Sequence, residues 1–283
     1  YNHMADLTTW GLLILGKLSS TPVILWGHGK GSIDKNWKNV GLRKCYMRLA
    51  KANIFYTSTA LNFWQRYLKP SSLFVAPNSL DTQKSFEYHK KFNSQIHTKR
   101  YTIFFSGRLT KSKNILFIID IANHLKKNFP MVHVFIVGDG PMRASLENKV
   151  KDLGLTENVS FYGNLFDEEE LAKLILQSYI TLLPNNAGLS IQHSMGYGTP
   201  AIIGDDFNNH GPEAVLVKHN VTGKICTNNN MADFINTISN LFNDTSQRKY
   251  LSLNSIDLIK NEFSVEKMSQ GFQNAIDFAT KQK

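Results

Sequence analysis

Residues 184–200, PNNAGLSIQHSMGYGTP, contain the residue types of a turn that could bind phosphate. The segment follows an apolar run and places Gly188-Leu189 just before an expected helix over residues 191–197. The first turn of a helix offers unpaired backbone N–H groups and the positive end of its dipole to an anion. A second turn of this kind, His210-Gly211-Pro212-Glu213, comes after the next apolar run. Two such turns in succession predict a site for a nucleotide diphosphate.

The loop at residues 106–114, SGRLTKSKN, supplies the cations that a leaving diphosphate needs. Arg108 offers a planar fork of donors and Lys113 a mobile point charge, so the two could neutralise a diphosphate as its bond to a sugar breaks. The alternative is that both are solvated cations in a polar loop, because surface charges often contribute nothing measurable.

Taken together, these segments resemble the C-terminal half of the retaining glycosyltransferases of the GT-B fold, family four. The usual sequence there is a Glu, seven residues, a second Glu and then Ala-Met-Ala-x-Gly-x-Pro, and here Asn185 and His193 occupy the two Glu positions. Arg108 and Lys113 match the family's Gly-Arg-Leu-x-x-x-Lys pattern. The resemblance implies an α/β protein of GT-B type, with two Rossmann-like domains that face a cleft and an N-terminal domain that lacks its opening strands.

The resemblance also assigns the nucleotide sugar to turns at the strand ends of the second domain. The N–H groups of Gly188 and Leu189 would face the diphosphate, and Asn185 would contact a sugar hydroxyl, because an amide can accept or donate a hydrogen bond. The backbone of Tyr162 and Gly163 would lie near the base. The complete set of expected contacts is Gly107, Gly138, Tyr162, Gly163, Asn185, Gly188, Leu189, His193 and Glu213.

Several of these assignments have structural alternatives. Gly138 could simply form a tight turn, which any strand-to-helix connection favours. His193 would bind the ribose through one nitrogen of a neutral imidazole, although a lone histidine on a helix is usually a packing or surface residue. Glu213 would take over part of the role of the missing carboxylates. His28, the third catalytic candidate with Arg108 and Lys113, would contact the donor sugar or the acceptor, or would be a turn residue.

Runs of strand and helix character alternate along the whole chain, as in parallel α/β sheets. We expect a partial acceptor-side domain with its linker over residues 1–98, the linker being the polar segment 81–99. A nucleotide-sugar-binding domain would follow over residues 99–262, and a C-terminal helix over residues 263–283 could cross back to the first domain.

The composition sets further limits. The formal charge of +10 favours anionic partners, but the sequence has no zinc-finger spacing or aromatic RNA-binding signature, so we expect no nucleic acid partner. Two distant cysteines, Cys45 and Cys226, argue against a disulfide framework. No His or Cys cluster has ligand spacing, so no metal and no cofactor beyond the donor substrate is expected. The apolar run at residues 10–18 is too short to span a bilayer and is predicted to be a buried helix.

The leading hypothesis is a retaining glycosyltransferase that moves a sugar from a nucleotide diphosphate to a glycan or lipid-linked precursor of a cell-surface polysaccharide or lipopolysaccharide. A GT-B-type sugar-nucleotide epimerase and a non-catalytic sugar-nucleotide-binding subunit are the alternatives. We expect a cytoplasmic protein that is peripheral on an anionic inner leaflet, because a basic run follows His28. The alternative is that this run is a solvated helix face. The basic residues are Lys30, Lys35, Lys38, Arg43, Lys44, Arg48 and Lys51.

Overall fold

The computed structural model describes residues 6–29, 40–92 and 101–281. The chain forms two compact units. Unit 1 comprises Tyr1–Ser79 and Glu262–Lys283, and unit 2 comprises Leu80–Asn261. Three of the basic residues expected at a membrane, Lys30, Lys35 and Lys38, lie outside the described residues.

Unit 1 is built on a parallel three-stranded sheet in the order β1-β2-β3, where β1 is Ile24–Gly27, β2 is Ala52–Phe55 and β3 is Leu73–Val75. Every residue of β2 is buried because both faces of the sheet are covered. The helices of this unit are α1 (Leu7–Leu18), α2 (Val40–Leu49), α3 (Ser58–Trp64) and α11 (Val265–Lys281), and the 3₁₀ helix η2 (Pro70–Ser72) precedes β3.

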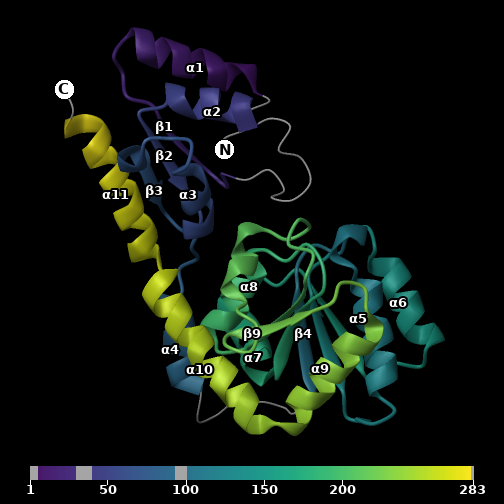
Figure 1. Ribbon diagram of the computed structural model, residues 1–283. Helices are drawn as coiled ribbons and strands as arrows, with labels where there is room; N and C mark the ends of the chain where they lie inside the picture. Colours follow the sequence, from purple (N-terminus) through teal and green to yellow (C-terminus); the bar gives the residue numbers. More distant parts are fainter. Residues whose placement is uncertain (1–5, 30–39, 93–100, 282–283) are drawn as a thin grey trace. The chain divides into compact units, whose positions relative to one another are not determined.

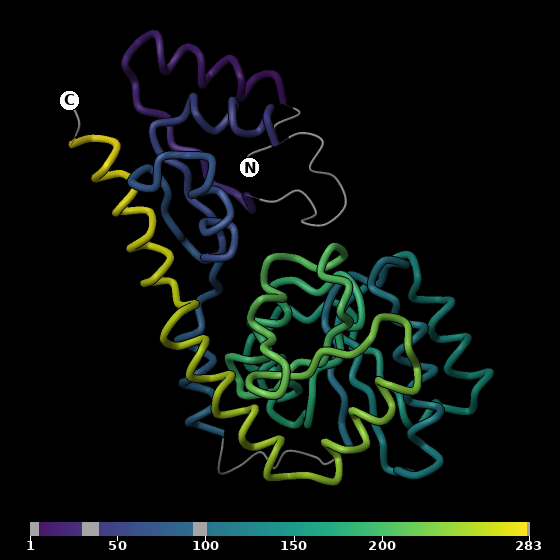
Figure 2. The backbone as a smooth tube through the Cα atoms, in the orientation of Figure 1, coloured from purple at the N-terminus to yellow at the C-terminus, as the bar shows by residue number. Residues whose placement is uncertain are grey.

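Successive residues of β2 pack against different helices, as the pleat of a strand requires. Ala52 and Ile54 lie in one apolar cluster with Ala275 of α11. Phe55 lies in another cluster with Leu13 of α1. The C-terminal helix therefore completes the core of unit 1, and the chain in Figure 2 starts and ends in this unit.

Unit 2 contains a parallel six-stranded sheet in the order β6-β5-β4-β7-β8-β9. Its strands are β4 (Thr102–Ser106), β5 (His133–Val137), β6 (Val159–Gly163), β7 (Ile180–Leu183), β8 (Ala201–Gly204) and β9 (Gly223–Cys226). The connecting helices are α4 (Gln83–Phe92), α5 (Ile115–Leu125), α6 (Arg143–Asp152), α7 (Glu168–Gln177), α8 (Leu189–Gly196), α9 (Met231–Asn243) and α10 (Thr245–Glu262), with the 3₁₀ helices η3 (Lys111–Lys113) and η4 (Pro212–Leu216). Figure 1 shows how these helices surround the sheet.

The strand order of unit 2 reverses between β4 and β7, which are neighbours in the centre of the sheet. The chain builds outward from β4 to β6, then crosses back to β7 and builds in the opposite direction. The connections that leave the carboxyl ends of β4 and β7 therefore diverge and leave a crevice, which is where open α/β sheets bind ligands. The sequence pattern predicted all of these strands except the short β9.

The polar segment 81–99 is not simply a linker, because it contains helix α4, which packs on α7 and α8 within unit 2. Phe92 of α4 lies in an apolar cluster with Phe104 and Ala172. The division between the units accordingly lies between Ser79 and Leu80, earlier than the expected position near residue 98. The low overall hydropathy of α4 concealed a helix with one buried face.

Helix α1 also differs from expectation, because it is not buried. Only Leu13 and Gly16 are buried in it, and the remaining apolar side chains are mostly exposed. A sequence that is apolar all round a helix usually indicates burial, but only one side of α1 packs against the described residues of unit 1.

Candidate functional site

The candidate site is formed in unit 2 by connections at the carboxyl edge of the sheet. The β4–η3 loop carries Arg108, and η3 ends with Lys113. The β7–α8 turn carries Asn185 and Gly188, and η4 carries Glu213. These connections flank the β4–β7 switch point, so the tertiary structure brings together the two sequence segments that were expected to bind a diphosphate.

Lys113 joins the two sides of the crevice. Its Nζ donates a hydrogen bond to the backbone oxygen of Asn186. Burial lowers the pKa of Lys113, and the negative charge of Glu213 opposes that shift. The lysine is therefore held by its neighbours with its charge directed at the β7–α8 turn. Arg108, in contrast, is exposed to solvent at the start of the same loop.

Gly107 and Gly138 allow the β4 and β5 connections to touch. A Cβ at Gly138 would lie 2.0 Å from the carbonyl oxygen of Gly107, and the φ of Gly138 is 127°. The N–H of Gly107 donates to Val137 O at 3.0 Å, and that of Gly138 donates to Gly163 O at 2.7 Å. The structure gives Gly138 a packing role, and any contact of these glycines with a nucleotide stays a prediction.

A histidine that the sequence reasoning did not assign to the site fixes the β7–α8 turn. Nδ1 of His210 accepts the N–H of Ala187 at 3.0 Å, so Nε2 must donate to Gly204 O, also at 3.0 Å. Burial lowers the pKa of His210, although its hydrogen bond to Gly204 opposes the shift. The neutral ring therefore connects the turn to the end of β8. The signal in the sequence was the turn at residues 210–213 itself.

Gly188 is the N-cap of α8, and Leu189 is its first residue. Gly211 N donates to Ala187 O at 2.6 Å, which places the second glycine turn beside the first. The carboxylate of buried Glu213 lies next to both, since its Oε2 would be 3.8 Å from a Cβ at Gly188 and 2.5 Å from one at Gly211. The first turn of α8 thus has one carboxylate and one ammonium group close by.

His193 contacts a carboxylate that the sequence did not suggest. Its Nε2 lies 2.8 Å from Oε1 of Glu168 at the start of α7, and the hydroxyl of Tyr197 donates to the same oxygen at 2.6 Å. Burial favours the neutral form of Glu168, but the hydrogen bonds from His193 and Tyr197 outweigh it and hold its pKa below the usual value. A nucleotide contact by the imidazole could therefore use only Nδ1, or Glu168 could make the contact instead.

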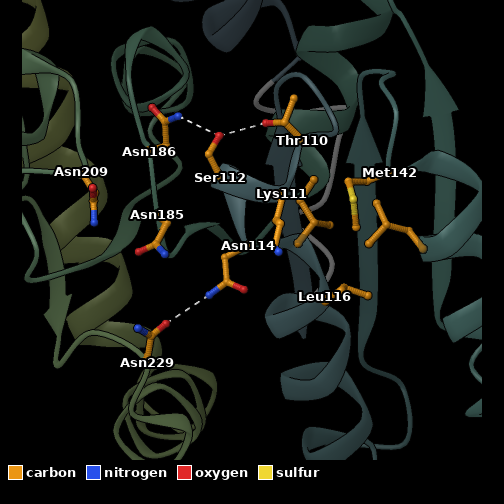
Figure 3. Close-up of a pocket in the computed structure, with 12 residues that line it drawn as sticks. Thr110, Lys111, Ser112, Asn114, Leu116, Met142, Asn185, Asn186, Asn209 and Asn229 are labelled. Atoms are coloured by element: carbon orange, nitrogen blue, oxygen red, sulfur yellow. Dashed lines mark hydrogen bonds between the residues drawn. The ribbon is translucent and has the colours of Figure 1, made fainter.

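A cavity of about 440 Å³ lies between the amino ends of α5 and α6 on one side and the turns that follow β7, β8 and β9 on the other. Oδ1 of Asn185 is buried and has no hydrogen-bond partner among the residues that the structure describes. Asn186 donates to Ser112 Oγ at 3.1 Å, and Asn114 donates to Asn229 Oδ1 at 3.3 Å. Figure 3 shows that the wall of the cavity is rich in amides, namely Asn114, Asn185, Asn186, Asn209 and Asn229. Neutral donors and acceptors of this kind suit hydroxyl groups.

Of the other expected site residues, Tyr162 and Gly163 end β6 at the same edge of the sheet, whereas His28 belongs to unit 1. The ring of Tyr162 packs edge-on against Phe135, with the ring centroids 5.6 Å apart. Gly163 has a φ of 67°. His28 follows β1 in unit 1, and its ring packs against Tyr56 at 4.6 Å. Within residues 6–29, 40–92 and 101–281, no group of three His, Cys, Asp or Glu residues could hold a metal ion. In the same ranges, no helix combines the length and apolar character needed to cross a bilayer.

Solved structures identify the architecture. The crystal structure of HepE from Anabaena in complex with UDP aligns with a TM-score of 0.75 at 18% identity, over 98% of this chain and 77% of that chain. Sucrose-phosphate synthase from Thermosynechococcus elongatus aligns with a TM-score of 0.71, also at 18% identity, over 96% of this chain and 72% of that chain. The protein has the GT-B fold.

Residues 87–257 match the family model described as Glycosyl transferases group 1, which is more than half of the chain. The protein belongs to this family. The chain is 28% identical over 171 residues to the GalNAc-α-(1→4)-GalNAc-α-(1→3)-diNAcBac-PP-undecaprenol α-1,4-N-acetyl-D-galactosaminyltransferase of Campylobacter jejuni, covering 58% of this chain and 45% of the relative. It is 23% identical over 260 residues to an uncharacterized glycosyltransferase of Haemophilus influenzae, covering 89% of this chain and 69% of the relative. The match thus spans less than half of the length of the first relative.

Proposed function

We propose that the protein transfers a sugar, with retention of configuration, from a nucleotide-diphosphate sugar to a glycan or lipid-linked precursor of a cell-surface polysaccharide or lipopolysaccharide. The observation that carries the proposal is the position of Lys113. Its ammonium group bridges the β4 and β7 connections beside the first turn of α8, whose N–H groups favour an anion. A diphosphate is the anion that fits a fixed cation, a helix start and a nearby arginine together.

In the proposed reaction, the bond between the anomeric carbon and the diphosphate oxygen breaks while a bond to the acceptor oxygen forms on the same face. The acceptor proton passes to the departing diphosphate oxygen, so no protein nucleophile is required. Arg108 and Lys113 stabilise the charge that develops on the leaving group, which is the largest contribution a preorganised site can make. The proposal includes no metal ion, because the two cations supply this charge.

The contacts of the sugar are proposed from the amide-rich cavity. Oδ1 of Asn185 needs a donor, and a sugar hydroxyl can provide one. Glu213 lies beside Gly188 and could accept a second hydroxyl, while His28 would act from unit 1 on the donor sugar or acceptor. Near the base and ribose we place Tyr162, Gly163 and the His193–Glu168 pair.

The acceptor and location complete the proposal. The Campylobacter relative is named for an acceptor that is linked to undecaprenol diphosphate, and a lipid-linked acceptor would require the enzyme to work at a membrane. We therefore propose a cytoplasmic protein that attaches to an anionic inner leaflet. Arg43, Lys44, Arg48 and Lys51 are the described basic residues of α2 and its end, and such residues contribute about 1 kcal/mol each near an anionic surface.

The decisive experiment measures turnover of a panel of nucleotide sugars by Arg108→Ala and Lys113→Ala variants. We expect each variant to raise the barrier by roughly 2 to 4 kcal/mol, which is about 30-fold to 1000-fold in kcat, as with the loss of one charge stabiliser. Lys127→Ala, which removes an exposed lysine of unit 2 outside the site, is the matched control.

Near-normal rates in both site variants would show that Arg108 and Lys113 do not stabilise the leaving diphosphate. Analysis of the products separates the remaining possibilities. Release of free nucleotide diphosphate together with a glycosylated acceptor indicates transfer, whereas a changed sugar that is still attached to the nucleotide indicates an epimerase. The anomeric configuration of the product tests retention.

A further inference from the structure

The cavity beside the β7–α8 turn has two chemically different walls. Figure 3 shows Asn185 and Asn209 on one side of the cavity, and Leu116 and Met142 on the other. Leu116 lies in the first turn of α5 and is 37% exposed, and Met142 is the N-cap of α6. We refer to Leu116 and Met142 as the apolar wall, and to Asn185, Asn186 and Asn209 as the amide wall. A ligand in this cavity meets hydrocarbon on one side and amides on the other.

The amide wall favours a ligand that carries hydrogen-bond donors. Asn186 donates to Ser112 Oγ at 3.1 Å, and Asn209 donates to Asp206 Oδ2 at 2.6 Å. These bonds use only the amide nitrogens, so the carbonyl oxygens can accept from a ligand. Oδ1 of Asn185 is buried and has no partner among the described residues, which is unfavourable until a donor reaches it.

The cavity is nearly uncharged. None of the twelve described residues that line it is a carboxylate, and Lys111 is the one lysine among them. A charged ligand would lose its hydration in the cavity with only this exposed lysine to offset the loss. The walls therefore favour a neutral group.

The position of the cavity identifies which part of a donor enters it. Asn185 and Asn186 belong to the same turn as Gly188, the N-cap of α8. Lys113 donates a hydrogen bond to the backbone oxygen of Asn186. A diphosphate held by Lys113 and the first turn of α8 would thus have the cavity next to it, and the sugar is the group attached there.

An acetamido group combines what the two walls require. Its N–H can donate to Oδ1 of Asn185, its carbonyl can accept from an amide or hydroxyl, and its methyl group can pack on the apolar wall. A hydroxyl in the same place would satisfy Asn185 but leave the apolar wall without a partner. The methyl group of a 6-deoxy sugar would cover the apolar wall but donate nothing to the amides.

Given the transfer reaction proposed above, we infer that the transferred sugar is an N-acetylated hexosamine, with its acetamido group between Asn185 and the apolar wall. Leu116 and Met142 then determine specificity and take no part in bond breaking. The diphosphate and its cations keep the roles already described, so the sugar preference and the transfer reaction can be tested separately.

The first test compares donors that differ in one substituent. UDP-N-acetylglucosamine is paired with UDP-glucose, and UDP-N-acetylgalactosamine with UDP-galactose, and release of UDP is measured with water or a supplied glycan as acceptor. We expect kcat/KM to be about tenfold or more higher for an acetylated donor than for its partner, as for other groups that fill a fitted apolar pocket. UDP-6-deoxyglucose, which has the methyl group without the amide, should behave like UDP-glucose.

A variant of the apolar wall tests where the preference arises. Leu116→Asn/Met142→Asn should reduce the ratio within a pair to about threefold or less, because the methyl group loses its apolar partner. Both positions lie at helix starts, where asparagine is well tolerated, and circular dichroism with thermal unfolding checks the fold. Met131→Asn/Leu253→Asn makes the same replacements at exposed positions outside the cavity and should keep the wild-type ratio.

Saturation-transfer NMR reads the same contact without turnover and without a particular base. Methyl N-acetyl-α-glucosaminide is the probe, and methyl α-glucoside is the comparison ligand. The acetamido methyl group should receive the strongest saturation from the wild type and from the Met131→Asn/Leu253→Asn control. In Leu116→Asn/Met142→Asn this signal should fall to the level of the ring protons.

The outcomes separate the inference from the proposed function. If hexose donors turn over as fast as their acetylated partners, the transfer reaction stands and the inference is wrong. The inference is also wrong if UDP-6-deoxyglucose matches the acetylated donors, or if the wall variant keeps the wild-type ratio. If no donor turns over but the acetamido methyl signal depends on the apolar wall, the acetamido site is supported and the proposed transfer is contradicted. If neither turnover nor saturation is observed, both are wrong.

Discussion

Replacing His193 by Glu tests whether the contact between His193 of α8 and Glu168 of α7 stabilises unit 2. The substitution restores the residue usual in the family, but the structure predicts that it destabilises the protein. In the wild type, Nε2 of His193 is 2.8 Å from Oε1 of Glu168. A glutamate at position 193 would instead place two carboxylates close together, and two like charges are unfavourable.

The size of the effect follows from distance and exposure. Two unit charges about 4 Å apart interact by about 4 kcal/mol at an effective dielectric constant of 20. Glu168 retains 36% of its side-chain exposure, so solvent screening and the positive charge of Lys84 reduce this value. We expect His193→Glu to lower the free energy of unfolding by about 1 to 2 kcal/mol at pH 7.5. His193→Gln, which adds no charge, is the matched control.

The pH dependence of stability tests the sign of this electrostatic effect. The hydrogen bonds to Glu168 hold its pKa below the usual value of a glutamate despite its burial, so its contribution to stability is present above that usual value and is lost as pH falls through the folded-state pKa. In His193→Glu, the two neighbouring carboxylates at positions 168 and 193 would raise the pKa of the pair. Protonation of one of them at lower pH relieves the repulsion. The deficit of His193→Glu relative to His193→Gln should therefore shrink between pH 7.5 and pH 5.

Urea unfolding followed by circular dichroism measures these differences. Tryptophan emission serves as a reporter of unit 1, because all four tryptophans fall within residues 1–79. In a Glu168→Gln background, the penalty of His193→Glu should largely disappear. The reasoning is refuted if His193→Glu is within about 0.5 kcal/mol of the control at both pH values, or if its penalty is unchanged in that background.

Two further predictions concern the turns of the site. Gly138→Ala should lower the free energy of unfolding by about 2 to 4 kcal/mol, because its Cβ would lie 2.0 Å from Gly107 O at a φ of 127°. The control Gly41→Ala, which has open space around the added Cβ, should change the free energy of unfolding little. Equal urea midpoints for the two variants would contradict the packing role of Gly138. His210→Ala should cost about 1 to 3 kcal/mol at pH 7.5, since the N–H of Ala187 loses its acceptor. Because burial lowers the pKa of His210, its contribution is present above about 6.5 and is lost as pH falls through the folded-state pKa, so the gap between wild type and variant should narrow by pH 5. A gap that stays constant with pH would show that the ring is not held neutral by this contact.

The sequence by itself determined the alternating strands and helices of residues 102–204. Each strand there is a short, mostly apolar run that ends at or next to a glycine or proline, and such local patterns depend on few distant contacts. It also placed Arg108, Lys113 and the Gly188-Leu189 turn at strand ends, and parallel strands bring their carboxyl ends to one edge of the sheet. This is why the sequence could predict that these turns lie together at one edge of the sheet; their role in binding stays a prediction.

Only the tertiary structure decided which groups meet. Glu168 and His193 are 25 residues apart, and Ala187 and His210 are 23 apart, so no local pattern relates them. The polar helix α4 was missed because its few buried side chains find their partners on α7 and α8. The burial of α1 was predicted wrongly for the converse reason: its composition is that of a core helix, but unit 1 provides an apolar surface for only one side of it. Composition determines what a helix can bury, and the packing of the remaining elements determines what it does bury.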